Sequence, residues 1–79
     1  MHYVYVLRSE RESDRFYVGL TADLRKRLRD HNAGHSIHTA KYIPWNLETY
    51  VAFSNKDKAV QFEAYLKSGS GRAFAKKRL

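Results

Sequence analysis

One carboxylate lies where the sequence otherwise places apolar side chains. Positions i, i+3, i+4 and i+7 of one segment are Ala59, Phe62, Glu63 and Leu66, which is the spacing of a helical face turned toward a core. An ionised carboxylate is costly to remove from water unless a cation or a metal ion accompanies it. Glu63 is therefore a candidate metal ligand. The alternative is an ordinary ion pair with Lys67, one helical turn further on.

A second pair of residues could handle a phosphate. Arg27 and His31 are four residues apart and border the apolar positions Leu24 and Leu28, so they should project together from the edge of a core. A guanidinium offers a planar fork to two phosphate oxygens, and an imidazole beside it can donate to the same phosphate or move a proton. The alternative is a merely solvated basic helix.

Tyrosine is frequent, with six in the chain, and Tyr5 and Tyr17 fall in runs that should form neighbouring strands. A phenol can take up or release a proton, although a buried tyrosine is more often a core residue whose hydroxyl is satisfied. Gly19 weakens the interior of the second run, which favours a bulge or the close approach of another group. These features converge on one layer of the fold.

The elements that must position these side chains begin with a hairpin. Residues 3–8 and 16–20 are rich in β-branched and aromatic residues, and the wholly polar stretch 9–14 lies between them. Thr21 can cap a helix that runs from about residue 22 to residue 32, and Gly34 marks its end. No helix or strand is predicted for the connection that follows.

The second half of the chain predicts one more strand, over residues 47–53, and two helices. Ser54 and Asp57 match a capping box for a helix that continues to about Lys67. Serines and glycines in residues 68–71 then end it, and a short third helix covers about residues 72–77. The predicted fold is α+β, a three-stranded, mainly antiparallel sheet flanked by helices in the order β-β-α-β-α-α.

Length, cysteine content and charge limit the classes of protein to which the chain can belong. The 79 residues suffice for a single domain, 1–79, and the absence of cysteine excludes disulfides, thiolate metal sites and cysteine nucleophiles. The apolar run at the N-terminus is too short for a signal peptide or a membrane span, so a cytoplasmic protein is expected. A formal net charge of +7 suits a protein that meets a polyanion such as nucleic acid.

The chain resembles the GIY-YIG nuclease superfamily, which is named after two tripeptides on its first two strands. Here the tripeptides read Tyr3-Val4-Tyr5 and Tyr17-Val18-Gly19. The run from Tyr17 to Leu28, followed by Asp30-His31-Asn32, is similar to the family's strand-to-helix segment, and residues 59–67 resemble its metal-binding helix. The resemblance covers nearly the whole chain, and small stand-alone bacterial members are the most similar.

Two departures from the family pattern concern the site. Tyr3 stands where the family name has glycine, which leaves Tyr5 as the functional position. Leu20 stands where the related excision-repair incision subunit carries a lysine. The cation missing at that position could be replaced by Arg27, His31 or Lys41.

What the resemblance implies is a metal-dependent endonuclease that hydrolyses DNA phosphodiester bonds. Tyr5 and Tyr17 would be the general base and its phosphate-positioning partner, in an order left open, while Arg27 holds the scissile phosphate and His31 assists. Glu63 would hold one Mg²⁺ or Mn²⁺ ion, and the scarcity of buried carboxylates independently favours one metal over two. Small size and charge predict a preference for DNA structure, such as branches or single strands, over sequence. A link to DNA repair or recombination is part of what the resemblance implies.

The remaining basic residues are expected to grip the nucleic acid backbone without reading its sequence. They are Arg25, Lys26, Arg29, Lys41, Lys67, Arg72, Lys76, Lys77 and Arg78. One rival interpretation is a non-catalytic nucleic-acid-binding module with the nuclease fold, and another is a protein-interaction domain. Glu63 favours an enzyme, because a binding module has no need of a carboxylate facing the tyrosines.

Overall fold

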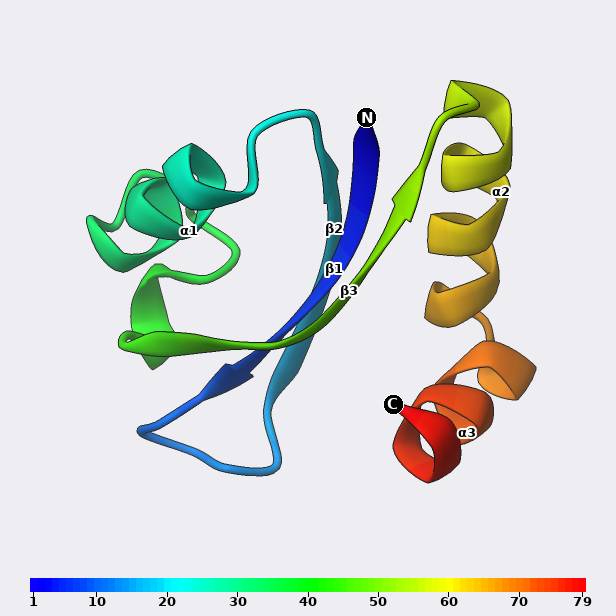
Figure 1. Ribbon diagram of the computed structural model, residues 1–79. Coiled ribbons are helices and arrows are strands. Elements are labelled where there is room, and N and C mark those ends of the chain that lie inside the picture. Colours follow the sequence, from blue (N-terminus) through cyan, green and yellow to red (C-terminus); the bar gives the residue numbers. More distant parts are fainter.

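A three-stranded antiparallel sheet separates two layers of helix (Figure 1). The computed structural model describes all 79 residues, with strands β1 (His2–Ser9), β2 (Phe16–Thr21) and β3 (Trp45–Phe53) in the order β2-β1-β3. Helix α1 (Leu24–Asn32) lies against one face, and helices α2 (Lys56–Lys67) and α3 (Gly69–Arg78) lie on the other. The predicted α+β class and the order β-β-α-β-α-α are confirmed.

The central strand β1 contributes to both layers, because successive side chains of a strand point to opposite faces. Val4 and Val6 pack toward α2, whereas Tyr5 and Leu7 pack toward α1. All four are buried, because β1 is covered on both sides. The β1–β3 pairing shifts register between Val6 and Leu7, which leaves Glu48 as an extra residue on β3.

The face under α2 and α3 carries an aliphatic and aromatic core. Ala59 and Leu66 of α2 are buried there against Val4 and Val6 of β1. The partly buried residues around them are Val18, Leu20, Phe53, Phe62 and Ala75. Burying one leucine or valine side chain stabilises a fold by about 1.5–3 kcal/mol, so this layer holds α2 in place.

The face under α1 is more polar and more aromatic. Tyr5, Leu7 and Trp45 are buried at its centre. Packed against them are Tyr17, Leu24, Leu28, Tyr42, Ile43 and Leu47. The predicted inward stripe of Leu24 and Leu28 is confirmed, and it docks α1 over the tyrosine-bearing part of the sheet.

Helix α1 begins later than its sequence signals predicted. The N-cap is Asp23, whose side chain accepts a hydrogen bond from the backbone N–H of Lys26, and Thr21 is therefore not the cap. The Thr21 hydroxyl instead accepts from the backbone N–H of Asp23 at 3.1 Å and stabilises the turn before the helix. At the other end Gly34 has a φ of 81°, the left-handed conformation that favours glycine after a helix.

The two C-terminal helices also differ from the predicted boundaries. Asn55, not the Ser54–Asp57 pair, caps α2 by accepting from the backbone N–H of Lys58. Ser68 ends α2 and caps α3 at once, because its hydroxyl accepts from the backbone N–H of Gly71. Helix α3 therefore starts at Gly69 rather than near residue 72.

A short 3-10 helix, η1 (Ala40–Tyr42), lies within the connection that the sequence left unassigned. None of the three α-helices combines the length and the apolar composition needed to cross a bilayer.

Candidate active site

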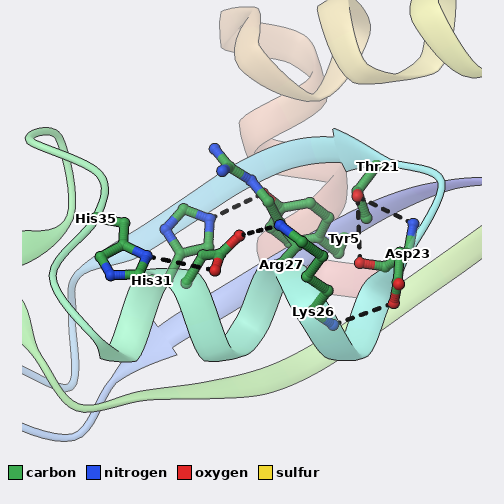
Figure 2. A network of polar contacts seen from close by, with 8 residues as sticks. Tyr5, Thr21, Asp23, Lys26, Arg27, His31 and His35 are labelled. Carbon is green, nitrogen blue, oxygen red and sulfur yellow. Dashed lines mark hydrogen bonds and ion pairs between the residues drawn. The ribbon is translucent and has the colours of Figure 1, made fainter.

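The phenol of Tyr5 is the centre of a buried polar cluster beneath α1 (Figure 2). Its oxygen lies 2.9 Å from Nε2 of His31 and accepts a hydrogen bond from Nε of Arg27 at 3.3 Å. The Tyr5 side chain comes from β1, and its two partners come from successive turns of α1. Three of the side chains singled out in the sequence thus meet at one oxygen atom.

Helix α1 can deliver both partners because of its register. Leu24 and Leu28 fix one side of the helix on the sheet, and Arg27 and His31 flank that stripe four residues apart. His31 is completely buried, and Arg27 is partly exposed. The cluster therefore has a closed end at the imidazole and an open end at the guanidinium.

Gly19 makes room for the phenol. It pairs with Tyr5 across the β1–β2 ladder, and a Cβ atom at position 19 would overlap the phenol oxygen and Cζ of Tyr5. The Tyr5 ring therefore lies directly over the backbone of β2. Close approach by another side chain, as the glycine indicated, is the reason for its place in the strand.

Burial and charge set the protonation states of the cluster. Burial raises the pKa of the Tyr5 phenol, the hydrogen bond and charge of Arg27 oppose this rise, and the negative charge of Glu63 adds to it. Burial, followed by the charge of Arg27, lowers the pKa of His31 below its ordinary value. At neutral pH the cluster consists of a neutral phenol, a neutral imidazole and a guanidinium.

Thr39 is a member of this cluster that the sequence did not indicate. Its hydroxyl oxygen lies 2.7 Å from Nδ1 of His31, and the residue is completely buried. Its backbone carbonyl accepts a hydrogen bond of 2.8 Å from Nε1 of Trp45. No periodic pattern marks the loop that carries Thr39. Nothing in the sequence therefore indicated that its hydroxyl contacts His31.

Tyr17 lies beside the cluster at the edge strand β2. Its ring centroid is 5.1 Å from that of His31 and 6.4 Å from that of Tyr5. Unlike Tyr5, Tyr17 is partly exposed, and it borders an open groove. The two tyrosines thus belong to one aromatic group, and Tyr17 is the one that solvent reaches.

Glu63 stands apart from the hydrogen-bonded cluster. Its carboxylate forms an ion pair of 3.4 Å with Nζ of Lys67, and its side chain is 23% exposed. The carboxylate is close enough for its charge to raise the pKa of Tyr5. Glu63 thus forms the ion pair with Lys67 that was the alternative interpretation. It is also a half-buried carboxylate whose charge acts on the Tyr5 phenol, as a metal ligand near the site would.

The groove beside Tyr17 runs between the β1–β2 hairpin and α3, with a volume of about 970 Å³. Three of the expected backbone-gripping residues line it, namely Lys67, Arg72 and Lys76. Two arginines that the sequence analysis did not select, Arg8 and Arg15, line it as well. The groove is therefore rich in cations, and it lies on the face of the sheet that α3 covers, opposite the cluster beneath α1.

The other expected backbone contacts are scattered. Arg25, Lys26 and Arg29 are exposed on α1, where Lys26 pairs with Asp30 at 3.0 Å. Lys41 lies on η1 with its ammonium over the ring of Tyr42. The exposed residues Lys77 and Arg78 end α3. The exposed basic side chains thus lie on α1, on η1, along the groove and at the end of α3.

Comparison with known proteins identifies the family of this chain. The chain belongs to the GIY-YIG family, because it matches the GIY-YIG catalytic domain over residues 1–78. The family places it in an endonuclease superfamily whose fold acts on nucleic acid. It is also similar to UPF0213 proteins of Streptococcus pyogenes serotype M5 (strain Manfredo), serotype M2 (strain MGAS10270) and serotype M28 (strain MGAS6180). Each is 39% identical over 72 residues, which cover 90% of this chain and 76% of the relative.

Proposed function

We propose that this protein is a metal-dependent endonuclease that hydrolyses DNA phosphodiester bonds. The observation that carries the proposal is the meeting of Tyr5, Arg27 and His31 at one phenol oxygen, next to the open edge of the sheet. A buried cluster with a guanidinium at its exposed end suits a phosphate whose oxygens approach from solvent. The membership of the chain in the GIY-YIG family supports the interpretation of this cluster as part of a nuclease site.

Tyr17 is the better candidate for the general base, and Tyr5 for the positioning residue. The base must reach the water that attacks phosphorus, and Tyr17 is the exposed member of the pair, whereas only 2% of Tyr5 is exposed. The raised pKa of Tyr5 also disfavours its phenolate. Tyr5 would instead hold Arg27 and His31 in place through its oxygen.

A tyrosine needs assistance to act as a base near neutral pH. The reference pKa of tyrosine is about 10, so the deficit is roughly 3 units, or about 4 kcal/mol. A neighbouring cation favours a phenolate, and Arg27 is the cation of this cluster. Substrate binding would add to this by excluding water from around that charge.

Arg27 would bind the scissile phosphate with its terminal nitrogens. Its Nε–H is already donated to Tyr5, which orients the planar fork and leaves the two terminal NH₂ groups free for phosphate oxygens. His31 would act through Tyr5, because both of its ring nitrogens are within hydrogen-bonding distance of protein oxygens. The imidazole thus supports the phenol and does not itself touch the phosphate.

Glu63 would hold the metal ion. It is a half-buried carboxylate, and no cluster of three or more carboxylate, histidine or cysteine side chains accompanies it. A magnesium or manganese ion that keeps several of its water ligands can bind through one carboxylate, so the available donors fit one such ion. When bound, the ion would supply positive charge to stabilise the leaving oxygen.

We further propose that the substrate is selected by structure, such as a branch or a single strand, and that the enzyme serves DNA repair or recombination. A domain of this size has few elements to insert into a groove and read bases. Its exposed basic residues on α1 and along the groove contact the backbone, which carries no sequence information.

The test is cleavage of labelled branched, single-stranded and linear duplex DNA by the purified protein with Mg²⁺ or Mn²⁺. We expect Tyr17→Phe, Arg27→Ala and Glu63→Gln each to reduce cleavage by at least 100-fold. Asp57→Asn, an exposed change on the same helix as Glu63, is the matched control and should cleave normally. Cleavage that persists in Glu63→Gln would remove the metal assignment.

A second candidate function is non-catalytic binding of nucleic acid. The ion pair between Glu63 and Lys67 favours it, since a paired carboxylate is less available to a metal ion. This alternative predicts tight, salt-sensitive DNA binding with no cleavage under any metal condition. The same set of substrates therefore distinguishes the two functions.

A further inference from the structure

The groove between the β1–β2 hairpin and α3 has apolar walls as well as cations. Val6 and Val18 of the sheet and Ala75 of α3 line it. Its volume of about 970 Å³ is at the upper end of the range of about 300–1,000 Å³ that drug-sized ligands occupy, so it has room for at least one nucleotide. Apolar walls contribute nothing to the binding of phosphates, but they suit the faces of unpaired bases.

An exposed aromatic ring also lines this groove. Phe16, the first residue of β2, is 52% exposed, and the guanidinium of Arg8 lies over its ring at 5.3 Å from the centroid. This cation–π contact helps to hold the ring in place. Any base can stack on an aromatic side chain, because every base has a π-face. Phe16 therefore offers a stacking surface that suits an unpaired base and not a base enclosed in a duplex.

The unpaired charges of the groove lie mainly on α3. Of its two carboxylates, Glu48 is paired with Arg8 at 3.8 Å, and Asp14, in the β1–β2 loop, has no ion pair. Arg72 and Lys76 have no acidic partner either, and they are four residues apart on α3, so they project from the same side of the helix. A phosphate backbone in the groove would therefore follow α3 and avoid the loop.

Tyr17 is the residue at which the groove meets the cluster beneath α1. It lines the groove, and its ring centroid is 5.1 Å from that of His31 on the other face of the sheet. Because β2 is an edge strand, DNA in the groove reaches the cluster by turning around this edge. The molecule measures only 30 × 26 × 18 Å, whereas duplex DNA is stiff over a length of about 50 nm. A single strand follows such a turn far more easily than a duplex.

We propose that this groove binds an unpaired DNA strand, with a base stacked on Phe16 and the phosphates along Arg72 and Lys76. The choice of DNA rests on the proposed function, and the groove would then be the element that selects single-stranded or branched substrates. A duplex would contact the cations alone, since its bases are stacked on one another and cannot reach Phe16 or the apolar walls.

Binding in the absence of metal tests the groove apart from catalysis. Fluorescence anisotropy in EDTA compares the affinity of the full chain for a labelled single strand and for an abasic strand of the same length. We expect the strand with bases to bind at least about five-fold more tightly, which is the lower end of the effect of one base–aromatic stack. Equal affinities would overturn the proposal, because phosphates alone would then account for binding.

The variant Phe16→Thr removes the ring and keeps a residue that favours strands. Its affinity for the single strand should fall at least about five-fold, whereas its affinity for the abasic strand and for a duplex should change less than about two-fold. Tyr50→Thr is the matched control, because it removes a ring of 53% exposure from β3, outside the groove, and should bind all three ligands normally. A variant Phe16→Thr that binds the single strand normally, or that loses equal affinity for all three ligands, would overturn the proposal. If this variant does not fold, the abasic comparison with the unaltered protein decides alone.

Cleavage assays with Mn²⁺ separate this inference from the proposed function. Base-dependent binding without cleavage would refute the nuclease and support the groove assignment. Cleavage combined with base-independent binding would refute the groove assignment and support the nuclease.

Discussion

The Tyr5 ring lies over Gly19 of the neighbouring strand, with its phenol oxygen in the space that a Cβ atom at position 19 would fill. This contact makes the glycine part of the site, although it bears no chemical group. The phenol can reach Arg27 and His31 only because the backbone of β2 leaves that space open.

Substitution of Gly19 by alanine should therefore damage stability and activity together. The new methyl group forces the Tyr5 ring off its two partners, and overpacking of this kind costs roughly 1–3 kcal/mol. Urea denaturation and DNA cleavage measure the two effects. Gly69→Ala is the matched control, since no atom lies within 4 Å of a Cβ placed there and alanine favours the helix. Equal losses in the two variants would contradict the role of the Tyr5–Gly19 contact.

Arg27 should not be replaceable by lysine. An ammonium cannot donate to Tyr5 and offer a planar fork to phosphate at the same time, because that combination needs Nε and the terminal nitrogens of a guanidinium. We expect Arg27→Lys to lower kcat/KM by about 100-fold, measured with a labelled oligonucleotide. Arg25→Lys, an exposed change two residues away on α1, should alter it by less than about two-fold. Similar effects of the two changes on kcat/KM would show that Arg27 acts only as one of several surface cations.

Stability should fall as the pH drops below about 6.5, the ordinary pKa of histidine. Burial and Arg27 lower the pKa of His31 in the folded chain, so below 6.5 the unfolded chain binds a proton that the folded chain does not. The free energy of unfolding then decreases by up to about 1.4 kcal/mol per pH unit until the folded protein is protonated as well. The Asp30 carboxyl does not contribute in this window, because Lys26 holds its pKa below the ordinary value of 3.8.

Urea denaturation at a series of pH values between 8 and 5 measures this slope. His31→Gln should be less stable at pH 8, because its hydrogen bonds are lost, yet its stability should depend less on pH. His38→Gln, at an exposed position, is the control and should keep the slope of the unaltered protein. A His31→Gln variant with the full slope would show that another group is responsible.

Removal of the Lys67 ammonium should make Glu63 a better metal ligand. The lysine occupies the carboxylate through an ion pair of 3.4 Å, and its side chain is 52% exposed, so the competition is weak. A pair of this kind contributes about 0.3–0.5 kcal/mol, which corresponds to roughly two-fold in affinity. We expect Lys67→Gln to lower the Mn²⁺ concentration for half-maximal binding by about this factor, as measured by calorimetry, whereas Glu63→Gln abolishes binding. Unchanged affinity in both variants would place the metal elsewhere.

The strands and helices could be predicted because the side chains that pack against a core have a characteristic composition and spacing in each kind of element. The β-branched and aromatic composition of residues 3–8 indicated the strand that carries Tyr5, and the helical spacing of Leu24 and Leu28 indicated that Arg27 borders the core. The same reasoning indicated that Glu63 borders a buried stripe. In each case local geometry leaves few alternatives once one face is apolar.

The helix ends and Thr39 could not be predicted, for two different reasons. At the caps several polar neighbours are chemically able to accept the first N–H, and tertiary docking decides between Thr21 and Asp23. Ser68 looked like a helix end and is also a helix start, because its hydroxyl caps the next helix. Thr39 reaches His31 only through a loop anchored by Trp45, a contact that no spacing encodes.

The groove beside Tyr17 should supply a separable part of the DNA affinity. Arg8 and Arg15 line it but have acidic partners, Glu48 at 3.8 Å and Glu12 at 3.1 Å. Arg72 and Lys76 line it without an acidic partner within ion-pair distance, so they are the cations most available to phosphates.

Replacement of Arg72 and Lys76 together by glutamine should therefore weaken DNA binding and reduce its dependence on salt. Each lost phosphate contact lowers the slope of log K against log salt by about one, so a decrease of up to about two is expected. Fluorescence anisotropy with a labelled oligonucleotide between 50 and 200 mM salt measures it. A double substitution of Lys56 and Lys58 by glutamine removes the same charge from exposed positions at the far end of α2 and is the control. If both double variants lose equal slope, net charge and not the groove attracts the DNA.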